Sequence, residues 1–132
     1  MAFGVFDLLH DGHRHFFSEA KKLGDKLIVV LATDNTVKML KNHLPINSFN
    51  KRLENLKKES LVDEVILGDE VLDSWTAIPK YKPDTMAIGY DQTELEKSLK
   101  KFITKNLLSI RLVKISPHKD GVIHSSTFRS KV

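Results

Sequence analysis

The chain contains no cysteine, and this absence removes several kinds of chemistry at once. Without thiols it has no disulfide, no thiolate metal site and no cysteine nucleophile. No apolar run approaches the roughly 20 residues needed to span a bilayer. The beginning of the sequence also lacks the charged-then-apolar layout of a signal peptide. These absences predict a cytoplasmic protein with no membrane partner.

The sequence also shows no catalytic carboxylate pair, no serine triad, no internal repeat and no low-complexity linker. Its 132 residues, 41% hydrophobic and 29% charged, are ordinary for one globular domain, which we expect to span residues 1–132. The net charge of +4 suits anionic small ligands. Because the acidic residues are interspersed and no long basic run occurs, the charge pattern does not favour nucleic acid as a partner.

Hydrophobic periodicity alternates between strand-like and helix-like segments along the chain. The order predicts an α/β protein with a Rossmann-like, doubly wound parallel sheet in a single domain. The expected strands are 1–6, 26–32, 64–68, 85–89 and 110–115. The expected helices are 12–23, 34–41 with Asp34 or Asn35 as its cap, 48–59 capped by Ser48, 75–81, 93–106 and one beginning near Ser125.

Several polar or glycine positions directly follow predicted strands. His10, Asp34, Gly89 and the stretch near Ser116 each stand at such a place. Ligands of doubly wound sheets bind beyond the carboxyl ends of the strands, at the switch point. We therefore expect these positions to converge on one edge of the sheet.

The segment from Gly4 to His13 reads as a strand, a tight turn and the first turn of a helix. His10 and His13 lie three residues apart, so they share one helix face. A ligand there would also face the free N–H groups and the positive dipole end of the helix, which attract phosphate. The alternatives are two polar residues satisfied at a helix cap, or a metal-binding pair. Without a nearby cysteine or carboxylate cluster, the pair falls short of a zinc site.

The block GVFDLLHDGH resembles the HxGH signature of the nucleotidyltransferase superfamily, the cytidylyltransferase-like enzymes. Further blocks follow in the order of that family: DNTVK, PIN, RL, VDEVILGD, KPDTMAIGYDQ and IHSST. The GYDQ block is similar to archaeal-type FAD synthases, close relatives of the glycerol-3-phosphate cytidylyltransferases. Asp11 departs from the pattern, since proline is common at its position.

The resemblance implies transfer of a nucleoside monophosphate from a nucleoside triphosphate to a phosphate-bearing acceptor, with release of pyrophosphate. ATP with FMN is the pair expected first, and a glycerol-3-phosphate cytidylyltransferase or a sugar-phosphate adenylyltransferase is the alternative. A non-catalytic module that binds a nucleotide or nucleic acid is an alternative of another class. The family also implies Mg²⁺ or another divalent cation, and its members are often homodimers.

The family's functional positions carry over to named residues of this chain. His10, His13 and Lys41 would be catalytic, with Lys38 or Lys41 reaching the triphosphate. Arg52 has two open roles, a phosphate contact or a structural salt bridge. Asp7 either hydrogen-bonds its loop or helps to hold Mg²⁺. The nucleotide-binding positions are Gly4, Phe6, Lys38, Gly89, Asp91 and the hydroxyl cluster Ser125, Ser126 and Thr127.

The missing general base is consistent with this chemistry. A phosphate monoester has a second pKa of about 6, so it is already largely an anionic nucleophile at neutral pH. What remains is to align it with the α-phosphate and to neutralise charge. Histidines, lysines and helix N-termini are sufficient for that work.

Overall fold

A five-stranded, entirely parallel sheet organises the chain in the computed structural model, which describes residues 1–71 and 74–117. The strand order is β3-β2-β1-β4-β5, so β1 lies at the centre. Strands β2 and β3 are added on one side of β1, and β4 and β5 on the other, which places the switch point of the sheet between β1 and β4. The strands are β1 (Ala2–Gly4), β2 (Ile28–Leu31), β3 (Glu64–Leu67), β4 (Thr85–Gly89) and β5 (Arg111–Ile115).

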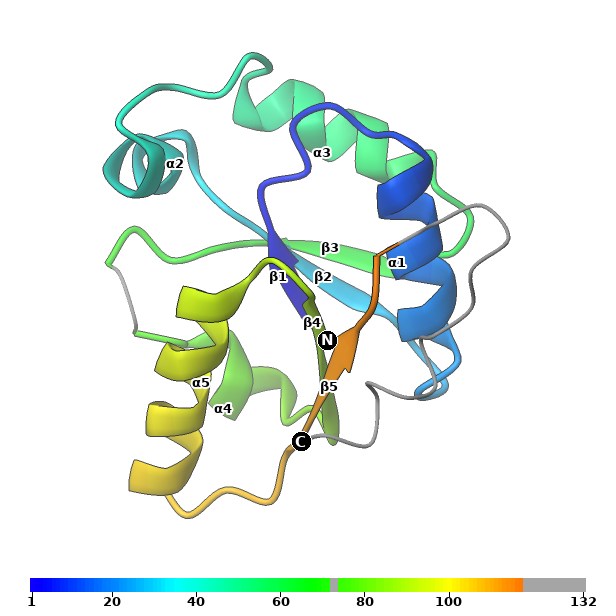
Figure 1. Ribbon diagram of the computed structural model, residues 1–132. Coiled ribbons are helices and arrows are strands. Elements are labelled where there is room, and N and C mark those ends of the chain that lie inside the picture. The colour runs from blue at the N-terminus through cyan, green and yellow to red at the C-terminus, as the bar shows by residue number, and fades with distance from the viewer. Residues whose placement is uncertain (72–73, 118–132) are drawn as a thin grey trace.

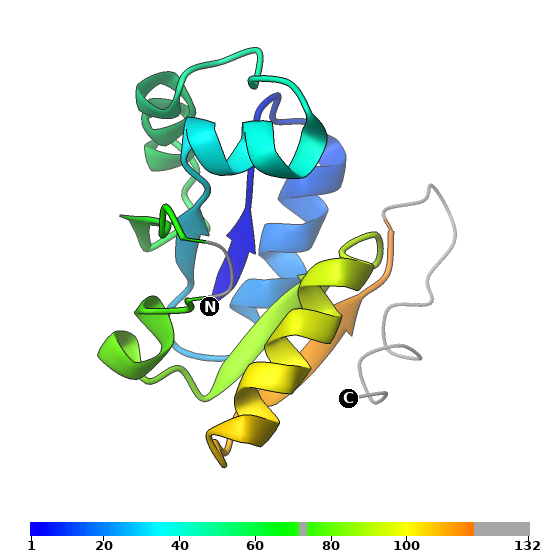
Figure 2. The ribbon, with the colours of Figure 1, turned by 90° about the vertical axis from the view of Figure 1, so that its left-hand side faces the viewer.

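Helices cover both faces of this sheet (Figure 1). They are α1 (Asp11–Lys21), α2 (Asp34–Lys41), α3 (Phe49–Lys57), α4 (Ala77–Tyr81) and α5 (Thr93–Lys105). In Figure 1, α1 and α3 lie on one side of the sheet and α4 and α5 on the other. Figure 2 shows α2 across the top of the molecule, toward which β1 points. Within the described ranges, no helix has both the length and the apolar character to cross a bilayer.

Two hydrophobic clusters hold the layers together, because successive strand residues face opposite sides of the sheet. Val29 and Leu31 of β2 pack with Phe17 and Leu56, from α1 and α3. Val30, between them, belongs to the cluster on the other face. That second cluster contains Ile78, Met86, Leu99 and the buried Trp75, whose ring meets Phe3 edge-on at 5.0 Å. The expected Rossmann-like sheet is confirmed, and Phe16, Phe17 and Trp75 are buried in its two clusters.

Two local expectations are wrong. The first strand ends at Gly4 rather than at residue 6, because Phe6 has a left-handed φ of 47° that turns the chain out of the sheet. Thr33, rather than Asp34 or Asn35, is the N-cap of α2, and its hydroxyl accepts from the Thr36 N–H. Ser48 caps α3 as predicted. The helix expected near Ser125 lies outside the described residues.

Candidate active site

The junction of β1 and α1 places His10 at the N-cap of the helix. Its backbone is extended, and its Nδ1 accepts the Gly12 N–H at 3.0 Å. A neutral imidazole that accepts at Nδ1 carries its proton on Nε2. The exposed His10 ring therefore presents an N–H donor outward. Gly12 permits this contact, because a Cβ there would lie 2.8 Å from the His10 ring.

His13 stacks directly against His10. The two ring centroids are 4.0 Å apart and the ring planes differ by 26°. On its other side His13 meets the Phe6 ring edge-on, with centroids 5.4 Å apart. Its Nδ1 is buried and has no hydrogen-bond partner among the described residues. A buried polar atom without a partner is costly, and such atoms often mark ligand sites.

The surroundings of His13 favour its neutral form. Burial lowers the pKa of His13 below the ordinary value for histidine, and the neighbouring His10 lowers it further. The Asp91 carboxylate acts in the opposite direction and raises the pKa. Because β4 is the parallel neighbour of β1, the loop after β4 leaves the sheet at the same edge as the loop that leads to His10, as the sequence predicted for the carboxyl ends of the strands.

Phe6 and Gly4 explain each other. The Phe6 ring is buried, and it folds back over Gly4, where a Cβ would lie 2.6 Å from the ring. The Phe6 ring thus fills the space beside Gly4 and packs against His13. The side-chain contacts of Phe6 are with the protein core, and its role in nucleotide binding stays a prediction.

The expectation of free N–H groups at the start of α1 is also wrong in part. The Gly12 N–H bonds the His10 ring, and those of His13 and Arg14 bond the His10 carbonyl oxygen at 3.0 and 3.1 Å. His10 thus caps the helix from both its side chain and its backbone. What the helix end offers an anion is chiefly its dipole and the two imidazoles.

Asp7 fixes the loop that follows β1. Its two carboxylate oxygens accept the backbone N–H groups of Ile46 and Asn47 at 2.6 and 2.8 Å. The Asn47 side chain donates to the Asp7 carbonyl oxygen at 2.7 Å. Of the two roles left open for Asp7, these contacts support the hydrogen-bonded loop. The loop after α2 is thereby tied to the loop that leads to His10.

Arg52 is fully buried, and its guanidinium is surrounded by acceptors. It donates to the carbonyl oxygens of Val5, Ala32 and Asn47 at 2.8–3.1 Å and to the Asp34 carboxylate at 2.6 Å. These bonds connect the carboxyl ends of β1 and β2 to α3. Arg52 has no exposed surface with which to meet a phosphate, so its contacts support the structural role. They also explain why Asp34 does not cap α2.

The GYDQ block forms a tight turn after β4. The Gln92 N–H donates to the Gly89 carbonyl oxygen, and the Gln92 side chain bonds the Gly89 N–H and the Phe3 carbonyl oxygen at 2.8 and 2.9 Å. This leaves Tyr90 and Asp91 exposed at the corner of the turn. The sequence interpretation did not single out Tyr90, an exposed aromatic residue directly after the glycine that ends β4.

The remaining predicted positions divide into two groups. Lys38 and Lys41 are exposed on α2, and their placement brings two cations to the carboxyl ends of the strands. Ser125, Ser126 and Thr127 lie outside the described residues. Earlier in the chain, the Ser116 carbonyl oxygen lies 3.2 Å from His15 Nε2, which ties the end of β5 to α1.

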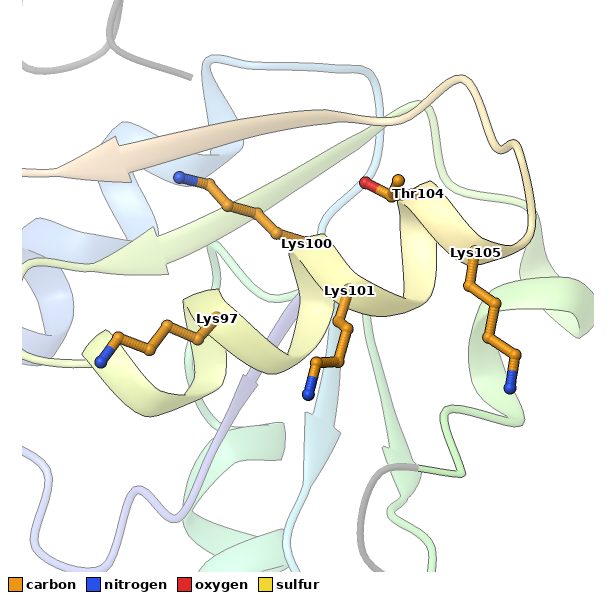
Figure 3. A pocket seen from close by; sticks show the side chains of 5 residues that line it. All are labelled: Lys97, Lys100, Lys101, Thr104 and Lys105. Carbon is orange, nitrogen blue, oxygen red and sulfur yellow. The ribbon is translucent and has the colours of Figure 1, made fainter.

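Two other features bear on ligands. No group of three histidines or carboxylates within residues 1–71 and 74–117 could cage a metal ion. A shallow hollow of about 500 Å³ lies on α5 between Lys97, Lys100, Lys101, Thr104 and Lys105 (Figure 3). All five lining residues belong to α5, which lies on the other side of the sheet from α1. Lys97 and Lys100 pair there with Glu94 and Glu96, as expected for a solvated charged face.

Comparison with known proteins shows the family of this chain. The sequence profile of the Cytidylyltransferase-like family matches residues 1–131. The chain belongs to the cytidylyltransferase-like family. The sequence prediction of a nucleotidyltransferase enzyme is thereby confirmed.

Curated relatives of this family member cover almost its whole length. The FAD synthase of Thermoplasma volcanium is 40% identical over 132 residues, which are 100% of this chain and 92% of the relative. The FAD synthase of Thermococcus sibiricus is 38% identical over 98% of this chain and 88% of the relative. A crystal structure named as the lipopolysaccharide core biosynthesis protein of Thermoplasma volcanium matches with a TM-score of 0.82. It is 41% identical and covers 90% of this chain and 96% of that chain.

Proposed function

We propose that the chain is an FAD synthase, which transfers the adenylyl group of ATP to FMN and releases pyrophosphate. The observation that carries this proposal is the stacked pair of His10 and His13 at the carboxyl end of β1. The names of the relatives supply the substrate pair. The difference in name of the matched crystal structure gives a reason to test other acceptors as well.

The reaction needs one bond to form and one to break. A phosphate oxygen of FMN attacks the α-phosphorus of ATP, and the bond from that phosphorus to the bridging oxygen of the β-phosphate breaks, so pyrophosphate leaves. Negative charge builds on the equatorial oxygens of the α-phosphate during this displacement. Donors fixed before the reaction stabilise that charge without reorganising.

His10 and His13 would supply these donors. The hydrogen bond from Gly12 holds the His10 ring with Nε2–H outward, and stacking on His10 and Phe6 holds the His13 ring. The neutral form of His13 that its surroundings favour still donates one N–H. An α-phosphate beside the pair would also raise the pKa of His13, because an anion stabilises the imidazolium.

Other residues would bind the rest of ATP. Lys38 and Lys41 act as mobile charges toward the triphosphate, and the turn from Gly89 to Asp91 lies beside the nucleotide. Mg²⁺ would offset triphosphate charge and orient the leaving pyrophosphate. Asp91 is an exposed carboxylate whose charge acts on His13, so it would be available as a ligand for Mg²⁺ bound to the triphosphate. Mg²⁺ beside substrate phosphates usually takes only about one or two protein carboxylates.

The test is a pyrophosphate-release assay that crosses ATP and CTP with FMN, glycerol 3-phosphate and sugar 1-phosphates, with and without Mg²⁺. The expected result is rapid release with ATP and FMN only, dependent on Mg²⁺, with FAD as the second product. If only CTP with glycerol 3-phosphate turns over, the proposed substrates are wrong although the chemistry stands. If no pair turns over and a nucleotide still binds tightly, the chain is a binding module.

A further inference from the structure

Several large apolar side chains are exposed to solvent in the loop before His10, on α2 and in the loop after α2, and we group four of them. Leu8, Leu40, Leu44 and Ile46 are exposed to 54, 62, 58 and 77%. We call them the apolar rim. Burying such side chains stabilises a protein by about 1.5–3 kcal/mol each, so a gathering left in water indicates a surface that something else covers.

The rim is one surface because Asp7 joins the segments that carry it. Leu8 follows Asp7, and the backbone N–H of Ile46 donates to the Asp7 carboxylate at 2.6 Å. The Asn47 side chain donates to the Asp7 carbonyl oxygen, so both the side chain and the backbone of Asp7 bind the second loop. The loop from Asn42 to Asn47 is thus fastened beside the loop that leads to His10.

Helical spacing adds the other part of the rim. On α2, Thr36 and Val37 are buried against the body of the protein, and Leu40 lies one turn further along the same face. Asn42 ends the helix in a left-handed conformation. Leu40 is nevertheless exposed, and so is Leu44 in the loop that follows the helix.

Cations stand on the same helix as part of the rim. Lys38 and Lys41 are exposed on α2, which also carries Leu40, and His10 follows Leu8 by two residues. An apolar surface with cations on the same short helix complements a ligand with a flat apolar ring at one end and a phosphate monoester at the other. We propose that the apolar rim binds the isoalloxazine ring of FMN and so directs its phosphate toward His10 and His13; this rests on the proposed function.

A second copy of the chain fits the rim less well. A stable protein interface buries about 1,200–2,000 Å² in total, which four side chains on two loops do not supply. A twofold contact centred on α2 would also bring Lys38 and Lys41 of one copy against the same residues of the other. The like charges would oppose that contact.

The test uses three single substitutions, Leu40→Gln, Leu44→Gln and Ile46→Gln, and one matched control. The control is Leu107→Gln, which changes a 91% exposed leucine at the opposite edge of the sheet. FMN binding is measured by quenching of flavin fluorescence, and turnover is measured with ATP. Each rim variant should raise the Kd and KM for FMN roughly tenfold, as expected for losing the burial of one apolar side chain. The KM for ATP, the melting temperature and the control should stay at wild-type values.

Selectivity gives a second measurement. Wild type should prefer FMN to glycerol 3-phosphate, and the rim variants should lose about the same factor of ten in that preference. Wild-type FMN affinity in all three variants would overturn the rim assignment and leave the proposed function intact. So would dissociation of a dimer by these variants with FMN affinity unchanged, because the rim would then cover a second copy. If wild type neither binds nor converts FMN, the proposed function and this inference fall together.

Discussion

At the β1–α1 junction each candidate site side chain is held by another part of the chain, whereas at the end of α2 the candidate side chains are exposed to solvent. His10 is fixed by Gly12, His13 by His10 and Phe6, and the loop before them by Asp7. Lys38, Lys41 and Leu40 are exposed on a single short helix. The difference is what stabilisation of a transition state and binding of a ground state would each require. Charge that develops in a transition state requires donors fixed in advance, while ground-state binding tolerates mobile side chains.

The largest effect should follow from breaking the framework of the fixed region. Arg52→Met keeps the aliphatic stem but leaves the Asp34 carboxylate and three carbonyl oxygens without their donor. The free energy of unfolding should fall by about 3 kcal/mol, measured by chemical denaturation. The neighbouring exposed change Lys51→Met should alter it by less than about 0.5 kcal/mol. Equal stability of the two variants would contradict the structural role of Arg52.

A smaller effect should follow from moving His10 without removing it. In Gly12→Ala the new methyl group would lie 2.8 Å from the His10 ring, so the ring has to shift. We expect kcat to fall on the order of tenfold with little change in the KM for ATP, since misplacement mainly affects the transition state. Gly24→Ala is the matched control, because a Cβ there meets nothing within 4 Å. A wild-type kcat for Gly12→Ala would show that the ring position is not critical.

Substitutions in the exposed end of α2 should change KM rather than kcat. Lys38→Ala or Lys41→Ala removes a solvated point charge, so the KM for ATP should rise about threefold to fivefold with kcat nearly unchanged. The effect should shrink as salt is added, because exposed charges are screened. Lys57→Ala, an exposed lysine on α3, is the control. Normal ATP affinity in both single variants and in the double variant would show that these lysines only solvate the surface.

The smallest effect concerns pH. The pKa of His13 is lowered in the folded chain by burial and by His10, while the unfolded chain has the ordinary value. As pH falls through the range between these two values, the unfolded chain takes up a proton that the folded chain does not, so stability decreases. Above the ordinary pKa of histidine this loss is absent. In His13→Asn the melting temperature should therefore fall less with acidification than in wild type, and parallel curves would contradict the shift.

The sequence was most informative where local signals decide the structure. The expected strand 26–32 contains the observed β2, Ile28–Leu31, and Ser48 predicted the start of α3. The spacing of His10 and His13 predicted that both would face one place, which their stacking confirms. These predictions succeeded because they depend on periodicity and on neighbours within one turn.

It was least informative where distant residues compete for the same group. Asp34 is a residue type that often caps helices, but its carboxylate accepts a hydrogen bond from Arg52, eighteen residues later. Thr33 caps α2 instead. The spacing of His10 and His13 did not indicate that the His10 ring would accept a hydrogen bond from the Gly12 N–H. The apolar rim was likewise not predictable, because Leu40 has the same helical spacing as a core residue. Only the three-dimensional structure shows that it is exposed.

The central claim is that His10 and His13 stabilise the α-phosphate in the transition state of adenylyl transfer to FMN. The most direct measurement is the single-turnover rate of labelled FAD formation from ATP carrying a radioactive α-phosphate, with FMN and Mg²⁺, in wild type, His10→Ala and His13→Ala. We expect labelled FAD from wild type, and rates lower by roughly 10²–10³-fold in each variant with ATP affinity changed only slightly. Labelled FAD formed at a near-wild-type rate by the variant that lacks both histidines would contradict the account.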